Sequence, residues 1–362
     1  MMSLGFTALI FTITFLSSAL KNLSMDAISL LERLAKIESY SGREGEMASF
    51  ILSYLESLGY EALIDCSNVL VLPEKEFIIA THMDTFRLLS QFTFDGEYAY
   101  GTGVCDAKAS IAAILLALKR IGFKELNFGV AFFCDEEGDG RGSMDFCRKY
   151  KPKMAVVMEP TDMAIANIQY GGLEITVKAR GIAAHGATPH MGRNAIEECI
   201  KAVSNLMGID EAIISVQYIS GGSPEDFAIP EECEARVELI FKPEIEVEEI
   251  LAKIRGILRS ENLEIIVKEA YNGFIGSKVP EILRDAINIV GYTARFSNMP
   301  SWTDAVNLHE HAGCDVAIFG PGELHLCHTR NERVRIRDII LAADTLVALN
   351  NLLEKGAPLD LY

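Results

Sequence analysis

Short apolar runs recur along the chain, bounded by Gly, Pro and helical segments. Four of them are FIIA at 77–80, FGVAFF at 128–133, MAVVM at 154–158 and DVAIF at 315–319. Runs of this length without polar alternation are typical of strands that are covered on both faces. The pattern therefore predicts a mostly parallel sheet covered by helices.

Apolar residues that recur every three or four positions predict helices around these strands. One helix is expected at 25–38 and a second at about 44–58. The segment AKASIAAILLALKR, at 107–120, is apolar nearly all round, which predicts a buried helix. Strands that alternate with helices favour the α/β fold class.

The pattern changes between residues 172 and 272. Half-buried strands with alternating polarity occur there with two amphipathic helices, in the order β-α-β-β-α-β. This order is typical of the split βαβ, ferredoxin-like unit. Because apolar runs of the first kind resume near Phe274, we predict an α+β domain at 172–272, inserted between two parts of a host domain at 25–171 and 273–362.

The N-terminal segment, residues 1–24, is apolar from Phe6 to Leu20 but is interrupted by Thr and Ser. A membrane-spanning helix needs about 20 apolar residues, and a signal peptide needs a basic segment and a small-residue cleavage site, so the segment fits neither well. We favour a third interpretation, in which Met25 is the true start and the extension carries no function. The alternative is an exported or membrane-anchored protein.

Composition narrows the classes of partner and compartment. The formal net charge is -18 over 362 residues, which argues against a nucleic-acid binder because phosphate contacts need clustered Lys and Arg. Eight scattered Cys residues without a CxxC pair indicate a reducing, cytoplasmic compartment rather than a disulfide framework. No membrane partner is expected.

Polar residues able to bind a metal follow the predicted strands of the first sheet. Ligands in open α/β sheets bind beyond the carboxyl ends of the strands, so we expect these side chains at one edge of the sheet. Neighbouring carboxylates raise one another's pKa unless a positive charge compensates them, which favours a bound cation. The residues are His82, Asp84, Asp106, the acidic cluster at 135–139, Glu159, His325 and His328.

The residue types indicate which cation fits. Imidazole combined with carboxylate suits zinc, and also manganese, cobalt or nickel. The number of carboxylates favours two divalent ions over one.

Five segments occur in a fixed order: HMD at 82–84, GTGVCDAK at 101–108, DEEGDGRGS at 135–143, MEPTD at 158–162 and GPGELHLCHTRNE at 320–332. They resemble the signature segments of the dinuclear-zinc aminoacylase, carboxypeptidase and deacylase family, which includes acetylornithine deacetylase and succinyl-diaminopimelate desuccinylase. The resemblance implies that the host domain is catalytic and that the inserted domain is a lid that commonly dimerises. It also implies that two divalent ions are bound, with zinc as the expected metal and cobalt or manganese as alternatives.

The resemblance also implies a metal-binding role for each matching residue. Asp106 resembles the carboxylate that bridges both ions. His82 and Glu159 would complete the coordination of one ion, and Glu137 and His328 would complete the coordination of the other.

Three further residues would act in catalysis. Glu136 would be the general base, taking a proton from the attacking water and passing it to the leaving amine. Asp84 would orient His82 by accepting its second N–H. His185, in IAAHGATPH on the lid, would donate a hydrogen bond to the oxyanion, in the partner subunit's site if the protein dimerises. His190 is the rival in the same segment.

Family members often hold an Asn and an Arg on the lid for the substrate's carboxylate. The matching positions here are Phe227 and Ile240, with Arg236 as an alternative. The remaining candidates have simpler interpretations. His325 is expected to be a loop residue or an outer contact of the site, and His309 and His311 are expected to be exposed on a helix. Asp135 is expected to accept a hydrogen bond in the outer shell of the site, and Asp139 is expected to be a solvated turn residue.

The function that the resemblance implies is hydrolysis of a linear amide. The segments EPTD, PSWTDAVNL at 300–308 and CHTRNE are most similar to the branch that releases lysine or ornithine from an acyl group or an amino-group carrier, in lysine and arginine biosynthesis. A carboxypeptidase or dipeptidase of the same family is the alternative. A non-catalytic metal-binding assembly protein would be expected to lack Glu136 or a ligand, and none is lost. Expected partners are an acylated amino acid or short peptide, a small carrier protein, and a second copy of the chain.

Overall fold

The computed structural model describes residues 22–354 and divides the chain into two compact units. Within the described residues, the first unit comprises 22–167, 276–297 and 303–354, and the second comprises 168–275 and 298–302. The predicted inserted domain, 172–272, falls within the second unit. The predicted N-terminal extension lies outside the described residues except for 22–24, which belong to a helix over 22–35.

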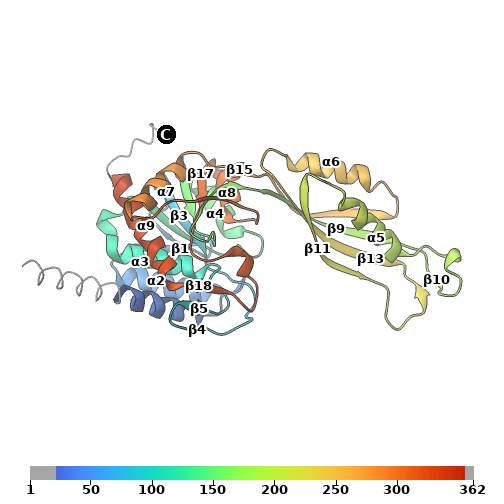
Figure 1. Cartoon of the computed structure of the whole chain (residues 1–362), viewed down its shortest axis with the longest axis horizontal. Coiled ribbons are helices and arrows are strands. Elements are labelled where there is room, and N and C mark those ends of the chain that lie inside the picture. The colour runs from blue at the N-terminus through green and yellow to red at the C-terminus, as the bar shows by residue number, and fades with distance from the viewer. Residues whose placement is uncertain (1–21, 355–362) are drawn as a thin grey trace, which may run out of the picture. The chain divides into compact units, whose positions relative to one another are not determined.

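A nine-stranded sheet forms the centre of the first unit (Figure 1). Its strands are β1 (Ala62–Asp65), β2 (Asn68–Val71), β3 (Phe77–His82), β6 (Gly129–Phe133), β7 (Met154–Val157), β8 (Ile165–Gln169), β15 (Phe274–Ile275), β16 (Phe296–Met299) and β17 (Asp315–Ile318). The order is β1-β2-β6-β3-β7-β17-β8-β15, and β16 pairs with β8.

The four predicted apolar runs form the adjacent central strands β6, β3, β7 and β17, and these pair in parallel. The neighbouring strands β2 and β8 pair with this core in the antiparallel sense. The predicted α/β fold class is confirmed, with a sheet that is parallel at its centre and mixed as a whole.

A small three-stranded sheet also belongs to the first unit and contains β18 (Arg333–Arg335), β5 (Tyr98–Tyr100) and β4 (Thr93–Phe94). Among the described residues, six α-helices follow the helix over 22–35 in this unit. They are α2 (Gly45–Ser57), α3 (Lys108–Ile121), α4 (Arg141–Lys149), α7 (Lys278–Ile289), α8 (Asp304–Ala312) and α9 (Ile336–Glu354). Helix α3 packs against α9, and α4 packs against α8. The prediction of a buried helix at 107–120 is confirmed, because α3 is buried from Lys108 to Leu118.

Both faces of the central sheet are covered, which explains why its strands are apolar without alternation. Ile79 and Phe132 belong to the core that includes α3 and α9. Phe133 points to the other face, since successive strand residues alternate, and its ring meets Phe146 of α4 at a centroid distance of 5.4 Å.

A four-stranded antiparallel sheet with two helices forms the second unit. Its elements are β9 (Gly171–Arg180), α5 (Ala195–Leu206), β11 (Ala212–Gly221), β13 (Glu232–Phe241), α6 (Val247–Ile257) and β14 (Leu263–Tyr271). Along the chain these six elements follow the predicted β-α-β-β-α-β order, and the sheet order is β11-β13-β9-β14. A two-stranded ribbon, β10 (Ala184–His185) with β12 (Ala228–Ile229), extends from it.

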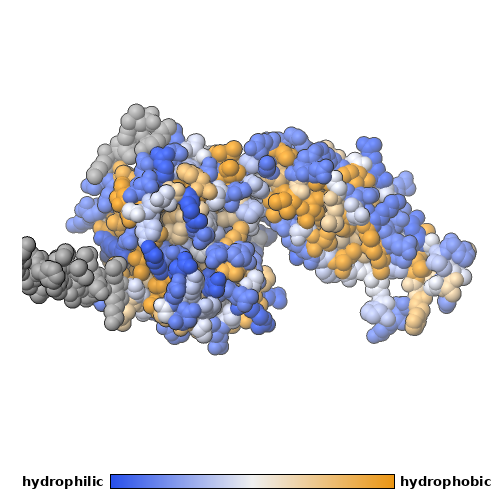
Figure 2. Space-filling model, in the orientation of Figure 1, coloured by the Kyte–Doolittle hydropathy of each residue, from blue (hydrophilic) through white to orange (hydrophobic). Residues whose placement is uncertain are grey.

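Apolar side chains remain at the surface of the second unit (Figure 2). Strand β11 is the terminal strand of its sheet and exposes Ile213 (63%), Tyr218 (48%) and Ile219 (48%). By contrast, no helix among residues 22–354 combines the length and apolarity that a bilayer crossing requires.

Candidate metal centre

The structure brings the polar residues that follow the central strands to one place in the first unit. His82 is the last residue of β3, Glu136 and Glu137 follow β6, and Glu159 follows β7. Asp106 lies two residues before the first residue of α3. The parallel centre of the sheet directs these strand ends to the same edge, as expected for a ligand site.

Two clusters of ligand atoms result, each with its atoms within 4.8 Å of one another. One contains His82, Glu136 and Glu159. The other contains Asp106, Glu137 and His328, the last in the loop after β17. All five residues with a predicted ligand role lie in these clusters, and Glu136 lies among them.

Asp106 lies between the clusters. Its Oδ1 is 2.9 Å from Nε2 of His82, and its Oδ2 is 3.5 Å from Nε2 of His328. Nε2 of His328 is also 2.8 Å from Oε1 of Glu137. One carboxylate oxygen therefore faces each histidine, which is the arrangement that a bridging ligand requires.

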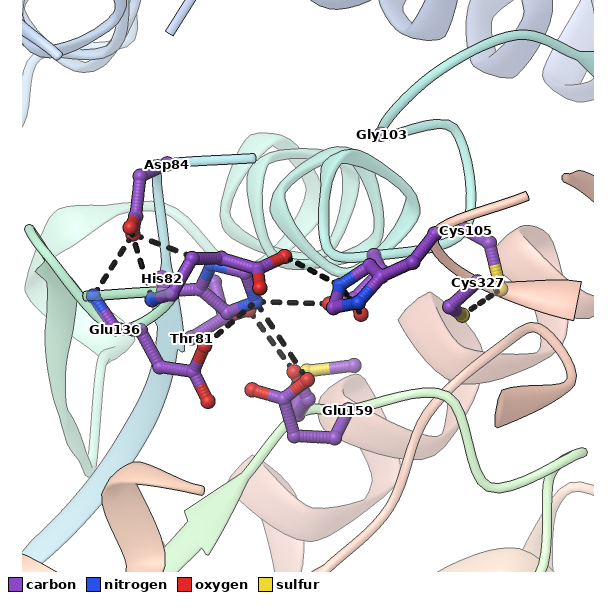
Figure 3. A network of polar contacts seen from close by, with 12 residues as sticks. Thr81, His82, Asp84, Gly103, Cys105, Glu136, Glu159 and Cys327 are labelled. Carbon is purple, nitrogen blue, oxygen red and sulfur yellow. Dashed lines mark hydrogen bonds and ion pairs between the residues drawn. The ribbon is translucent and has the colours of Figure 1, made fainter. Parts of the chain in front are cut away.

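Asp84 is fully buried and connects His82 to the acidic loop (Figure 3). Its Oδ1 lies 3.4 Å from Nδ1 of His82. The same carboxylate accepts the backbone N–H groups of Glu136 and Glu137 at 3.0 and 2.9 Å, and the hydroxyl of Ser41 at 2.8 Å. Asp84 thus fixes both the imidazole of His82 and the backbone that carries the two glutamates.

The pKa shifts of the residues in the clusters indicate an excess of negative charge. Burial raises the pKa of Glu159 to about 7, and it raises the pKa of Glu136 well above its usual range, with Glu159 and Glu137 adding to the effect. Burial lowers the pKa of His82, but the carboxylates around it, Glu136 first, more than compensate and raise it. This environment favours added positive charge.

The residues present fit divalent cations. Oε1 of Glu159 is buried and forms no hydrogen bond within residues 22–354, while Nε2 of His82 faces Asp106 and Glu159. A histidine nitrogen with two or three carboxylate oxygens per cluster is a donor set that suits zinc, manganese or cobalt. His82, Glu159, Asp106, Glu137 and His328 would hold two such ions.

Glu332 is a residue of this centre that the sequence analysis missed. Its buried carboxylate accepts the backbone N–H groups of Gly103 (3.0 Å), Cys105 (3.0 Å) and Asp106 (3.2 Å). Burial raises the pKa of Glu332 to about 7. Its only sequence signal is its place four residues after His328 in a signature segment. It positions the loop that presents Asp106.

Glu332→Gln is expected to weaken this loop. The amide retains one acceptor oxygen, so the N–H of Gly103 would face an NH₂ group instead of Oε2. An unsatisfied buried group costs about 1–3 kcal/mol, and loss of an outer support typically weakens metal binding about 10- to 100-fold. Urea unfolding and chelator competition measure the two effects. Glu323→Gln, in the same loop but 39% exposed, is the matched control and should change neither.

Helix α8 also supports the segment that follows β6. Nδ2 of Asn307 donates to the carbonyl of Gly140 (3.0 Å) and to Oγ of Ser143 (2.9 Å). Asp304, in the first turn of α8, is fully buried, and burial raises its pKa to about 8. Both residues belong to PSWTDAVNL, a segment that the sequence analysis singled out without assigning them a role.

The other candidates of the first unit lie apart from the clusters. His325 is exposed, with Nδ1 3.8 Å from Glu323, and Asp139 is exposed. Asp135 faces Arg141 at 3.8 Å. His311 is exposed as expected, but the expectation for His309 is wrong, since it is half-buried and Nδ1 lies 2.9 Å from the carbonyl of Cys314, which closes the end of α8.

The predicted lid residues all lie in the second unit. His185 ends β10 and is exposed, and its Nδ1 accepts the N–H of Ala187 at 3.1 Å. His190 is also exposed. Phe227 is 90% exposed, and Ile240 lies on β13, where it pairs with Gly172 and Ile213.

Comparison with known proteins extends these observations. The profile of peptidase family M20/M25/M40 matches residues 78–351. A LysW-lysine/LysW-ornithine hydrolase from Sulfurisphaera tokodaii is 24% identical, covering 88% of this chain and 93% of that protein. A succinyl-diaminopimelate desuccinylase from Psychromonas ingrahamii is 25% identical, covering 86% and 94%.

A solved structure shares the fold. The M20 family metallo-carboxypeptidase from Sulfolobus solfataricus superposes with a TM-score of 0.75 at 16% identity, covering 90% of this chain and 99% of that one. The family profile spans every strand end that contributes to the two clusters. The chain therefore belongs to peptidase family M20/M25/M40 and is a hydrolase of amide or peptide bonds.

Proposed function

We propose that the protein removes the acyl group or carrier from an N-acylated lysine or ornithine derivative, using two divalent ions. The observation that carries this proposal is the position of Glu136 among the ligand clusters, with its side chain only 10% exposed. The names of the hydrolase and desuccinylase relatives support an amide between an acyl group and an amino acid.

Divalent ions, when bound, polarise the amide carbonyl and lower the pKa of water. Glu136 then takes a proton from the attacking water and delivers it to the nitrogen of the leaving amine. Asp84 holds the backbone of Glu136 during both transfers, because it accepts that residue's N–H. Oε2 of Glu136 lies 4.0 Å from Nε2 of His82, which places this carboxylate beside the ligand atoms of the first cluster.

A cavity of about 620 Å³ in the first unit adjoins the second cluster and shares Glu137 with it. The ring of Phe86 stacks on the imidazole of His328 at a centroid distance of 4.8 Å. The cavity is also lined by Arg87 and Glu38, which are both exposed, and Arg87 forms no ion pair within residues 22–354. One cation and one anion in the same cavity match a substrate that carries a carboxylate and a free ammonium group.

A substrate panel tests this proposal. We expect turnover of Nα-acetylornithine, Nα-acetyl-lysine or succinyl-diaminopimelate by the metal-loaded protein. Arg87→Ala should raise KM by about 10- to 100-fold, because a hydrogen bond to a charged group contributes about 1.5–3 kcal/mol. The C-terminal amide of the same substrate should show no such change. Glu38→Gln should act likewise on the ammonium group, with Nα-acetylnorleucine as the insensitive substrate.

Two outcomes would redirect the proposal. If Arg87→Ala raises KM equally for the acid and for its C-terminal amide, Arg87 does not contact the substrate's carboxylate. Turnover of dipeptides with none of the acylated amino acids would favour the exopeptidase alternative, which the carboxypeptidase fold relative supports.

We also propose that the protein is a homodimer and that His185 acts in the partner's site. The exposed apolar side chains of the terminal strand β11 support association through the second unit. The N–H of Ala187 donates to Nδ1 of His185, so the neutral imidazole carries its proton on Nε2, ready to donate to an oxyanion. His185→Ala is expected to lower kcat by about 10²- to 10³-fold. His190→Ala should change kcat little.

Mixing two inactive variants tests action across the dimer. His185→Ala retains its own Glu136, and Glu136→Gln retains its own His185. A heterodimer of the two would contain one intact site if His185 acts in the partner's site, so activity should return after subunit exchange. Absence of recovery, with heterodimers demonstrated by mass, would place His185 in its own chain's site or outside the mechanism.

A cytoplasmic role in lysine or arginine biosynthesis is part of the same proposal. Its support is the LysW-lysine/LysW-ornithine hydrolase relative and the absence of disulfides among the eight Cys residues, all of which are described and free. In that role, the substrate can be an amino acid that is joined to a small carrier protein.

A further inference from the structure

Two cysteines from distant parts of the chain meet beside the second ligand cluster. Sγ of Cys327 lies 3.3 Å from Sγ of Cys105, although 222 positions separate them in sequence (Figure 3). Cys105 directly precedes Asp106, and Cys327 directly precedes His328. Each thiol is therefore covalently next to one member of the cluster that contains Asp106, Glu137 and His328.

We propose that Cys105 and Cys327 form a reversible disulfide when the protein meets a hydroperoxide, and that this bond withdraws Asp106 and His328 from metal binding. The first half of the proposal is a modification site and stands on the geometry of the thiols. The second half rests on the metal centre of the proposed function.

The geometry requires a small closure. A disulfide has a sulfur–sulfur distance of about 2.05 Å, so the two sulfurs must approach by about 1.2 Å. Ligand positions must hold to within about 0.5 Å for a site to keep its function. Movement of Cys105 and Cys327 is transmitted through one peptide bond to Asp106 and His328, so the closure is large enough to disturb the cluster.

Packing confines the pair to this contact. Cys105 is fully buried and Cys327 is 8% exposed. Gly322 leaves room for the thiol of Cys105, because a Cβ at that position would lie 2.2 Å from Sγ of Cys105. His328, next in the chain to Cys327, has a side chain that is 45% exposed, so Cys327 is the thiol that a small oxidant reaches.

The chemistry balances with a hydroperoxide as the oxidant. The thiol of Cys327 takes one oxygen from hydrogen peroxide to give a sulfenic acid, and water leaves. Sγ of Cys105 then attacks that sulfur, the S–O bond breaks, and the thiol proton of Cys105 leaves with the hydroxyl group as a second water. Together the two thiols lose two electrons, which reduce the peroxide to water, and a dithiol reductant reverses the reaction.

Peptide mapping of the metal-loaded protein after peroxide treatment tests the modification. Free thiols are alkylated under denaturing conditions without reductant, and a peptide containing Cys105 is expected to be linked to one containing Cys327. Cys327→Ala should abolish the link. Cys66→Ala should leave it intact, because Cys66 is the exposed thiol and lies in neither cluster. Full oxidation of Cys66 without any link between Cys105 and Cys327 would overturn the proposal.

Elemental analysis of the same samples tests the consequence. The metal content of the oxidised protein should fall to about half or less and return after treatment with a dithiol and metal. Linked protein with unchanged metal content would overturn the second half. If the reduced protein binds no metal, the proposed function fails, while the peptide map still decides whether the disulfide forms.

Discussion

Glu136→Gln is expected to lower kcat by about 10²- to 10⁴-fold while the metal content of the protein stays normal. Glutamine has nearly the same shape as glutamate, but its amide cannot take a proton from water at neutral pH. The variant should therefore bind substrate and fail at the proton transfers. Steady-state kinetics on the best substrate of the panel, together with elemental analysis, measure the two quantities.

The structure explains why metal should be retained. The backbone of Glu136 is held by Asp84 through its N–H, a contact that the substitution leaves in place. His82 and Glu159 remain in the first cluster, and Asp106 lies 2.9 Å from His82 on its other side. The first ion thus keeps three candidate ligands.

Asp139→Asn is the matched control. Asp139 lies three residues further along the same loop, and its side chain is exposed. The same change from carboxylate to amide should leave kcat within a factor of about two, as for most exposed substitutions. Loss of metal from Glu136→Gln would show that Glu136 is a ligand, and near-normal turnover would remove it as the general base.

The central sheet could be predicted because each strand carries its own signal. Phe77, Val130 and Val156 lie in runs that are apolar at every position, which only a strand covered on both faces tolerates. The edge of the same sheet gave no such signal. The terminal strand β1 has only four residues and is half-exposed, so its sequence resembles a loop.

The metal ligands could be predicted because the carboxyl ends of parallel strands converge. His82, Glu136 and Glu159 each follow a recognisable strand, so their proximity follows from the topology alone. Nothing local distinguishes Glu332 or Asn307 from surface residues. Their roles depend on backbone groups that the fold delivers from elsewhere, 226 positions away for the contact from Asp106 to Glu332 and 167 for that from Asn307 to Gly140.

The contact between Cys105 and Cys327 is unpredictable for the same reason. Each cysteine is buried, and nothing in the sequence links the two. Their mutual contact arises because the loop before α3 and the loop after β17 are held together, in part by the three N–H groups that Glu332 accepts.

His328→Ala is expected to weaken binding of one ion by at least about 10²-fold, since an inner ligand contributes more than the outer contacts whose loss costs about 10- to 100-fold. The hydrogen bonds with Asp106 and Glu137 raise the pKa of His328 to about 10, which shows how strongly two carboxylates compete for positive charge at this point. Without the imidazole, Asp106 and Glu137 are the two ligands that remain in this cluster. Chelator competition followed by elemental analysis measures the loss.

His325→Ala provides the comparison that makes this result specific. It removes the same side chain three residues earlier in the same loop, where the imidazole is 72% exposed and lies 3.8 Å from Glu323. Metal content and chelator resistance should stay normal in this variant. If both variants lose metal equally, the loop as a whole supports the site. The result would then give no evidence that His328 is a ligand. If neither loses metal, the second ion is held without either histidine, and the assignment of His328 fails.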